Sequence, residues 1–269
     1  MLNFDESVYG SPTYTGKVPG SVNLKLFVYK TKEEASRAGA NIIIQKANKA
    51  KDEGKSISMI IPTGNSPIPT YEICVDDYKN GKVSFSNVNF RSMDEYDGTT
   101  KYQDFIRYHI MDAVDAASYD IFNANAADPD GECLRYESGI DTDNLELLFG
   151  GTGEEGHIAF NEGARVLRTA CHRETLSAST KAANAFDFPG GPFPDYAYTI
   201  GFRVMFMAKK AMIYAFGEKK VSAVAKAVNG FIDPTAPISL MQLMPDADLI
   251  MDEAAAVELI KSGMVAENA

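Results

Sequence analysis

Short apolar segments alternate with helix-like segments along this chain, and that alternation restricts the folds it can adopt more than any other feature. Apolar runs typical of buried strands occupy residues 24–29, 57–61, 145–149, 198–202 and 211–216. Residues 83–93 also alternate as a strand does, with a change of register near Asn87. Strands that alternate with helices predict an α/β fold, in which helices cover both faces of a mostly parallel sheet.

Helix signals lie between most of these strands. Thr31 and Glu34 have the spacing of a capping box, which predicts a helix over residues 31–51. Further helices are predicted from about Pro69, over residues 102–114 and over residues 219–228. The groups discussed below all lie at the ends of predicted strands, and ligands bind beyond the carboxyl ends of strands in such sheets.

One irregular segment interrupts the pattern, from residue 163 to residue 194. It contains Pro189-Gly190-Gly191-Pro192, which ends any regular structure. We expect a single domain over residues 1–269 in which the segment 163–194 is a lid beside the site. The alternative is an exposed connection without a role.

Composition argues against several classes of protein. The formal net charge of −11 disfavours general nucleic-acid binding. No apolar run approaches the ~20 residues of a membrane span, and the N-terminal residues lack a secretory signal pattern. The three cysteines are an odd number and match no zinc or redox spacing. We therefore expect a cytoplasmic protein with reduced thiols, and neither a nucleic-acid partner nor a membrane.

A glycine-rich segment with several proton-transfer groups follows the strand predicted at residues 145–149. From Gly150 to Glu162 its sequence is Gly-Gly-Thr-Gly-Glu-Glu-Gly-His-Ile-Ala-Phe-Asn-Glu. Glycines let the backbone turn tightly and approach a ligand closely. A structural loop does not need this density of acids around an imidazole, so the segment indicates a catalytic site rather than a turn with solvated acids. Glu155, His157 and Glu162 could also ligate a metal ion, although no ligand cluster stands out.

Two other strand ends carry groups that suit a phosphate. The run Thr63-Gly64-Asn65-Ser66-Pro67 precedes a predicted helix and offers hydroxyl donors next to a helix N-terminus. It is not a Walker loop, because the Gly-Lys-Ser/Thr ending is missing. Gly217-Glu218-Lys219-Lys220 places lysines at a second such turn. A plain turn and a solvated lysine pair are the respective alternatives. A local pocket of this kind can attract an anion despite the negative net charge.

A third strand end carries adjacent carboxylates in the run Met93-Asp94-Glu95-Tyr96. Asp94 or Glu95 is expected on the ligand face, where a carboxylate can act as a general base. The alternative for Asp94 is a helix N-cap.

The four motifs together occur in the order seen in glucosamine-6-phosphate deaminases, also called glucosamine-6-phosphate isomerases. The chain resembles this family over roughly residues 30–260, and the run Gly-His-Ile-Ala-Phe-Asn-Glu is the most specific part. The resemblance implies a Rossmann-like three-layer αβα fold, shared with 6-phosphogluconolactonases and ribose-5-phosphate isomerases. It implies conversion of glucosamine 6-phosphate and water to fructose 6-phosphate and ammonia, without a redox cofactor or a metal. A phosphorylated amino sugar is then the expected partner, and a homo-oligomer is allowed.

The resemblance also implies roles for individual residues. Asp94 is the base that moves a proton between the first two carbons of the open-chain sugar. His157 opens the sugar ring, and Glu155 and Glu162 tune the imidazole. The substrate phosphate is held by Thr63, Gly64, Asn65, Ser66 and Lys220.

This chain departs from the family pattern at three places. The family usually has aspartate at the position of Glu155, whose extra methylene displaces the carboxylate by roughly 1.5 Å. Proline usually follows the motif, where this chain has Gly163, and an arginine that helps to hold the phosphate aligns near Phe186. The departures leave galactosamine 6-phosphate or another amino-sugar phosphate open as the substrate. A lactonase resembling 6-phosphogluconolactonase and a non-catalytic phosphosugar-binding protein are the other classes.

Overall fold

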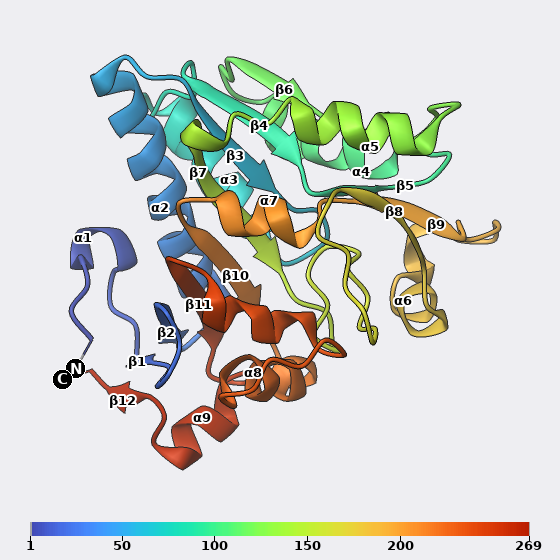
Figure 1. Ribbon diagram of the computed structural model, residues 1–269. Coiled ribbons are helices and arrows are strands. Elements are labelled where there is room, and N and C mark those ends of the chain that lie inside the picture. The colour runs from blue at the N-terminus through green and yellow to red at the C-terminus, as the bar shows by residue number, and fades with distance from the viewer. Residues whose placement is uncertain (1, 269) are drawn as a thin grey trace.

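The computed structural model describes residues 2–268, so both ends of the expected 1–269 domain, Met1 and Ala269, lie outside the described residues. A nine-stranded sheet runs through the middle of that part of the chain (Figure 1). Its strands, in spatial order, are β12 (Ala266–Glu267), β1 (Tyr14–Lys17), β2 (Leu24–Tyr29), β11 (Ala247–Asp252), β10 (Ala211–Ala215), β7 (Leu145–Gly151), β3 (Ile57–Ile61), β4 (Val88–Ser92) and β6 (Ser118–Asp120). From β2 to β6 every neighbouring pair is parallel, whereas β1 is antiparallel to both β2 and β12.

Helices cover both faces of this sheet, which gives three layers. One face packs against α2 (Lys32–Glu53), α3 (Ile68–Lys79) and the helix formed by α4 (Lys101–Ile106) and the π-helical η1 (Arg107–Met111). The other packs against α5 (Pro129–Ser138), α7 (Phe202–Met207), α8 (Val221–Val228), the 3₁₀ turn η5 (Pro237–Leu243) and α9 (Val257–Ser262). Figure 1 shows α2 on one side of the strands and α7 and α8 on the other. The predicted mostly parallel, three-layer α/β fold is confirmed.

The central strands are apolar on both sides, because each layer of helices needs its own core. Along β3, the side chains of Met59 and Ile61 belong to the core under α2 and α3, and that of Ile60 belongs to the opposite core. This is the two-residue period of a strand. All five residues of β3 are buried, which explains why a continuous apolar run predicted it.

A second, antiparallel sheet lies beside the first, with the order β5 (Asp94–Tyr96), β9 (Tyr196–Thr199) and β8 (His172–Thr175). The predicted strand 198–202 is therefore wrong in its bounds, since Phe202 begins α7, and β9 does not join the main sheet. The predicted strand 83–93 is also too long at its start. The backbone N–H of Phe85 donates to the Asp115 carboxylate instead of to a strand, and β4 begins at Val88.

The remaining short elements are α1 (Glu6–Tyr9), η2 (Thr142–Asn144), α6 (Ala178–Ala183), η3 (Ala185–Asp187) and η4 (Glu218–Lys220). The predicted capping of α2 is present in part. The Thr31 hydroxyl accepts from the Glu34 N–H at 3.2 Å, while the Glu34 carboxylate accepts from Lys30, one residue before the cap. None of the helices in residues 2–268 combines the length and the hydropathy that a bilayer crossing requires.

Candidate active site

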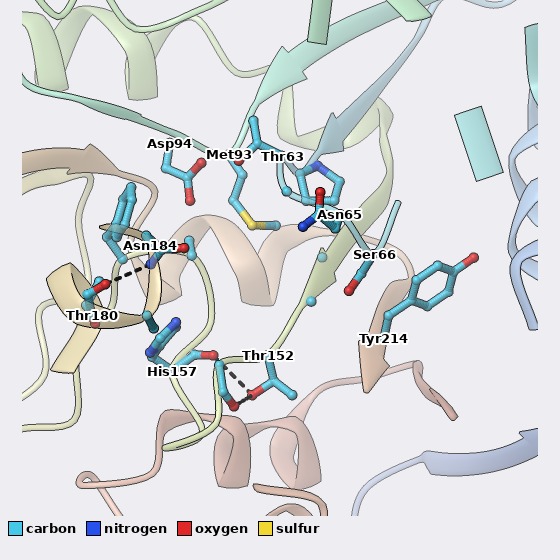
Figure 2. Close-up of a pocket in the computed structure, with 18 of the residues that line it drawn as sticks. Thr63, Asn65, Ser66, Met93, Asp94, Thr152, His157, Thr180, Asn184 and Tyr214 are labelled. Carbon is cyan, nitrogen blue, oxygen red and sulfur yellow. Dashed lines mark hydrogen bonds between the residues drawn. The ribbon is translucent and has the colours of Figure 1, made fainter. Parts of the chain in front are cut away.

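A pocket of about 320 Å³ lies at the carboxyl ends of β3, β7 and β10, next to the small sheet. Eight of the nine residues predicted from the sequence line it: Thr63, Gly64, Asn65, Ser66, Asp94, Glu155, His157 and Lys220. In Figure 2, Asp94 and His157 lie toward one side of the pocket and the loop with Thr63, Asn65 and Ser66 toward the other. The topology therefore brings together four motifs that are far apart in the sequence.

The loop 63–66 connects the end of β3 to α3. Gly64 has a φ of 87°, a left-handed conformation that glycine adopts without a steric penalty. α3 begins at Ile68 without a side-chain cap, so the N–H groups of its first turn, which Pro69 lacks, are available near the loop. Lys32 Nζ donates to the carbonyl oxygen of Asn65 at 2.8 Å and holds the loop from the start of α2. The sequence pattern gave no signal for this contact.

Lys220 is the last residue of η4, the turn that follows β10. It lines the pocket and is half-buried. Burial lowers the pKa of its ammonium group, with a smaller opposing effect from Glu154 and a reinforcing one from Lys219. Lys219 forms an ion pair with Glu154 at 3.2 Å. Within the described chain no carboxylate lies within ion-pair distance of Lys220 Nζ. Lys220 thus supplies a cationic group to a pocket in a strongly acidic protein.

Asp94 is the first residue of β5 and is only 6% exposed. Its Oδ1 is buried and has no hydrogen-bond partner among residues 2–268. Burial, and then the charge of Glu95, raise the pKa of Asp94 well above its ordinary value. A buried carboxyl group that faces a pocket and lacks a partner has the character of a general base. The alternative reading of Asp94 as a helix N-cap is wrong, because it is Glu95 that accepts the backbone N–H groups of Tyr102 and Gln103.

His157 lies over the turn that follows β7. Gly153 has to be a glycine here, since a Cβ at that position would lie 2.1 Å from Cε1 of the imidazole. The Thr152 hydroxyl donates to the carbonyl oxygen of His157 at 3.1 Å and closes the turn (Figure 2). Two residues on, Ala159 has a φ of 53° and is the one described non-glycine residue with a positive φ. Such strain is often retained at functional sites.

The environment of His157 favours the neutral imidazole. Burial lowers its pKa most, and Lys220 acts in the same direction, while Glu162 and Glu155 oppose both. Glu155 is exposed and lines the pocket. Glu162 does not line it, and its carboxylate accepts from the backbone N–H and the hydroxyl of Ser177, at 3.3 and 3.2 Å. Glu162 therefore acts on His157 through its charge rather than through a hydrogen bond.

The segment 163–194 contributes a wall of the pocket that the sequence did not identify residue by residue. Five of its residues line the pocket: Ser179, Thr180, Ala183, Asn184 and Phe186. The Asn184 amide donates to the Thr180 carbonyl at 2.9 Å, at the end of α6 (Figure 2). Phe186 is 63% exposed, which is unusual for a large apolar side chain beside a polar pocket.

Asn161 anchors the motif to the small sheet. Its side-chain amide is buried and donates to the carbonyl oxygens of Ile158 and Ile200 at 3.0 and 2.8 Å. These bonds give Asn161 a structural role, although it lies within a run of acid–base groups. Within residues 2–268 no group of three His, Cys, Asp or Glu side chains is arranged to hold a metal ion.

Comparison with known proteins identifies the family. Residues 30–250 match the family described as glucosamine-6-phosphate isomerases/6-phosphogluconolactonase. The chain belongs to this family. A glucosamine-6-phosphate deaminase of Proteus mirabilis (strain HI4320) is 35% identical over 247 residues, which cover 88% of this chain and 92% of that protein.

Solved structures of the isomerase/lactonase family share this fold. One, described as a monomeric glucosamine-6-phosphate deaminase, is 28% identical with a TM-score of 0.81, and the match covers 86% of this chain and 98% of the other. A 6-phosphogluconolactonase from Trypanosoma cruzi is 14% identical with a TM-score of 0.68, over 89% and 98%. A similarity as low as the second shows a common fold and no more.

Proposed function

We propose that this protein converts glucosamine 6-phosphate and water to fructose 6-phosphate and ammonia. The main support is the pocket itself. The buried carboxyl group of Asp94 shares it with the imidazole of His157, and the loop 63–66 and Lys220 in the same pocket are suited to bind a phosphate. The 35% identical deaminase of Proteus mirabilis supports the same assignment. The 6-phosphogluconolactonases in the family match at 14–16% identity, and this gives no reason to prefer their reaction.

Binding begins at the phosphate in this proposal. The loop Thr63–Ser66 offers hydroxyl and backbone donors, and Lys220 adds a positive charge. Holding the phosphate fixes the distance of the first two sugar carbons from Asp94 and His157. Binding energy from this remote group then contributes to the orientation of the reacting end.

Ring opening is the first chemical step. Neutral His157 removes the proton from the hydroxyl on carbon 1 and returns a proton to the ring oxygen as the bond between that oxygen and carbon 1 breaks. The lowered pKa of His157 keeps the imidazole free to accept this proton at neutral pH.

Isomerisation follows on the open-chain sugar. Asp94 takes the proton from carbon 2 and delivers a proton to carbon 1, while a proton from the substrate's ammonium group passes to the carbonyl oxygen of carbon 1. Carbon 1 becomes an alcohol and carbon 2 a protonated imine. Water adds to carbon 2 and ammonia leaves, which gives the ketone. Carbon 2 is oxidised as carbon 1 is reduced, so no external oxidant or reductant takes part.

Further features of the family assignment belong to the same proposal. The segment 163–194 acts as a lid over the bound sugar, and its Phe186 replaces a phosphate-binding arginine. The phosphorylated substrate and the three unpaired cysteines, Cys74, Cys133 and Cys171, suit a cytoplasmic enzyme of amino-sugar catabolism. Self-association stays a prediction that light scattering on the purified protein tests.

The deciding experiment is release of ammonia from glucosamine 6-phosphate by the purified protein. Galactosamine 6-phosphate and 6-phosphogluconolactone are assayed beside it, with glucosamine as the control that lacks the phosphate. We expect ammonia from glucosamine 6-phosphate and none from glucosamine at the same concentration. Hydrolysis of the lactone without any release of ammonia would contradict the proposal, and so would binding of all these sugars without turnover.

A further inference from the structure

Glu95 follows Asp94 in the chain and lies behind the pocket rather than in it. It is only 2% exposed, yet its carboxylate has four hydrogen-bond donors. Oε1 accepts from the N–H groups of Tyr96 and Tyr102, at 2.8 and 3.1 Å, and from the Thr99 hydroxyl at 3.2 Å. Oε2 accepts from the N–H of Gln103 at 2.7 Å.

These contacts make Glu95 the cap of α4 in place of the residue that precedes the helix. Thr100 occupies the N-cap position without a capping bond, and its hydroxyl donates to Asp104 instead. Two N–H groups of the first turn, on Tyr102 and Gln103, are satisfied by Glu95 from the neighbouring strand. Tyr102 lines the pocket, and its ring stacks on Phe160 with centroids 5.8 Å apart. Glu95 therefore fixes a wall of the site.

The same carboxylate acts on Asp94 through its charge. The two are consecutive residues of β5, both buried, and Glu95 is the neighbour whose charge raises the pKa of Asp94. Burial raises the pKa of Glu95 itself to about 7, although its four hydrogen bonds oppose this. A negative charge held next to a second buried carboxylate makes that carboxylate bind a proton more strongly.

The other titratable groups around Asp94 do not replace this effect. Tyr71 on α3, Tyr96 on β5 and Tyr102 on α4 have pKa values raised by burial, so they stay neutral in the working range. Across the pocket the ionisable lining groups are Glu154, Glu155, His157, Lys220 and Tyr214, whose pKa is raised by burial.

We propose that Glu95 is a positioning residue for the reaction: it holds the first turn of α4 against the pocket, and its charge makes Asp94 a stronger base. The proposal rests on the proposed function for its kinetic consequence. It assigns Glu95 a role without any contact to the substrate.

The kinetic test is the Glu95→Gln variant, which keeps the size of the side chain and removes its charge. The acidic limb of kcat/KM against pH should move to lower pH by about one unit, because Asp94 loses an adjacent like charge. Above that limb, kcat should fall, since a weaker base transfers the carbon-bound proton more slowly.

The matched control is Glu132→Gln. Glu132 is also buried and accepts a backbone N–H, from Asn123 at 2.8 Å, but it lies on α5 away from the pocket. Its acidic limb should not move. A limb that stays in place in Glu95→Gln, that moves to higher pH, or that moves equally in both variants overturns the proposal.

A second measurement needs neither a substitution nor a substrate. Wild-type protein with ¹³C-labelled carboxyl groups is titrated by NMR. Coupled carboxyl groups give curves with shared steps, so the Asp94 resonance should show an inflection where Glu95 ionises. Independent single steps for the two groups would overturn the proposal. If the wild type releases no ammonia, the proposed function fails, and this titration still decides whether Glu95 acts on Asp94.

Discussion

At the scale of single residues, the buried Asp94 and the half-buried His157 have opposite pKa shifts in this pocket. Burial raises the pKa of Asp94 and lowers that of His157. Each shift favours the uncharged form of the group, which for His157 is the form that accepts a proton. Groups whose environments move their pKa values in opposite directions are typical of acid–base catalysis.

Replacement of His157 by alanine should reduce kcat for ammonia release by about 10²- to 10⁴-fold, the usual contribution of one acid–base group. The fold should persist, because the imidazole makes no hydrogen bond with any of residues 2–268. His109→Ala is the matched control, since His109 lies on η1 outside the pocket and should keep the wild-type rate. Circular dichroism checks the fold of both. Wild-type turnover by His157→Ala would remove His157 from the mechanism.

The Asp94 carboxyl group should also reveal itself in the pH dependence of stability. Its pKa is higher in the folded state than in the unfolded chain, so the folded state binds the proton more tightly. Its contribution to stability is fully present below the unfolded pKa and is lost as pH rises through the folded pKa. The side chain in Asp94→Asn cannot ionise, so this variant should not lose that stability as pH rises.

We therefore expect Asp94→Asn to melt near the wild-type temperature at pH 4 and a few degrees above it at pH 8. Thermal denaturation at several pH values measures the difference. A difference in Tm that shrinks as pH rises would mean that Asp94 is stabilised as an anion in the folded protein.

At the scale of elements, the predictions are confirmed for segments whose sequence pattern fits only one kind of secondary structure. The run at β3 is buried on both faces, and the helix after Thr31 has its cap, so both were found near their true bounds. The chemical motifs were located equally well, because parallel strands bring their carboxyl ends to one edge. The same rule predicts that Asp94, His157 and Lys220 lie together at that edge.

The failures have a physical cause as well. β9 pairs with two short strands outside the main sheet, and no local pattern reveals which sheet a strand joins. β11 was not predicted although five of its six residues are buried. Asp248 interrupts the apolar pattern, and it pairs with Lys25 on β2 and with Lys210 just before β10. Ser179 and Asn184, in the segment 163–194, carry no catalytic signature in the sequence, and only the three-dimensional arrangement brings them to the pocket.

The turn η3 holds Phe186 beside the pocket. Its neighbour Asp187 accepts from the Tyr96 hydroxyl at 3.3 Å and pairs with Lys101 at 3.6 Å. Phe186→Arg should lower KM for the phosphorylated substrate several-fold, because a guanidinium binds phosphate better than a benzyl group. Phe231→Arg, at a 73% exposed position outside the pocket, is the control for added charge. Equal KM values for the two variants would mean that residue 186 does not reach the phosphate.

At the scale of the whole molecule, a buried ionic cluster ties the N-terminal segment to the sheet. Asp248 on β11 is fully buried and pairs with Lys210 at 2.8 Å and Lys25 at 3.3 Å. The Tyr9 hydroxyl donates to the same carboxylate at 2.5 Å. Nearby, β1 pairs with β12, so a strand near the start of the described chain lies beside the strand at its end (Figure 1).

Removal of the central carboxylate should destabilise the molecule without changing the site. We expect Asp248→Ala to lower the free energy of unfolding by about 3 kcal/mol, since two lysines lose a buried partner. Glu258→Ala, which breaks the exposed pair with Lys261, should cost less than about 1 kcal/mol. Urea denaturation measures both. Equal losses in the two variants would show that the cluster contributes no more than a surface pair.

The central claim is that Asp94 moves the proton between the first two carbons of the sugar. The most direct test follows deuterium incorporation at carbon from D₂O into the sugar phosphate by NMR, with wild type and with Asp94→Asn. We expect incorporation during turnover by the wild type and a rate lower by about 10²-fold or more in Asp94→Asn, with the pocket and the fold intact. Incorporation by Asp94→Asn at the wild-type rate would contradict it.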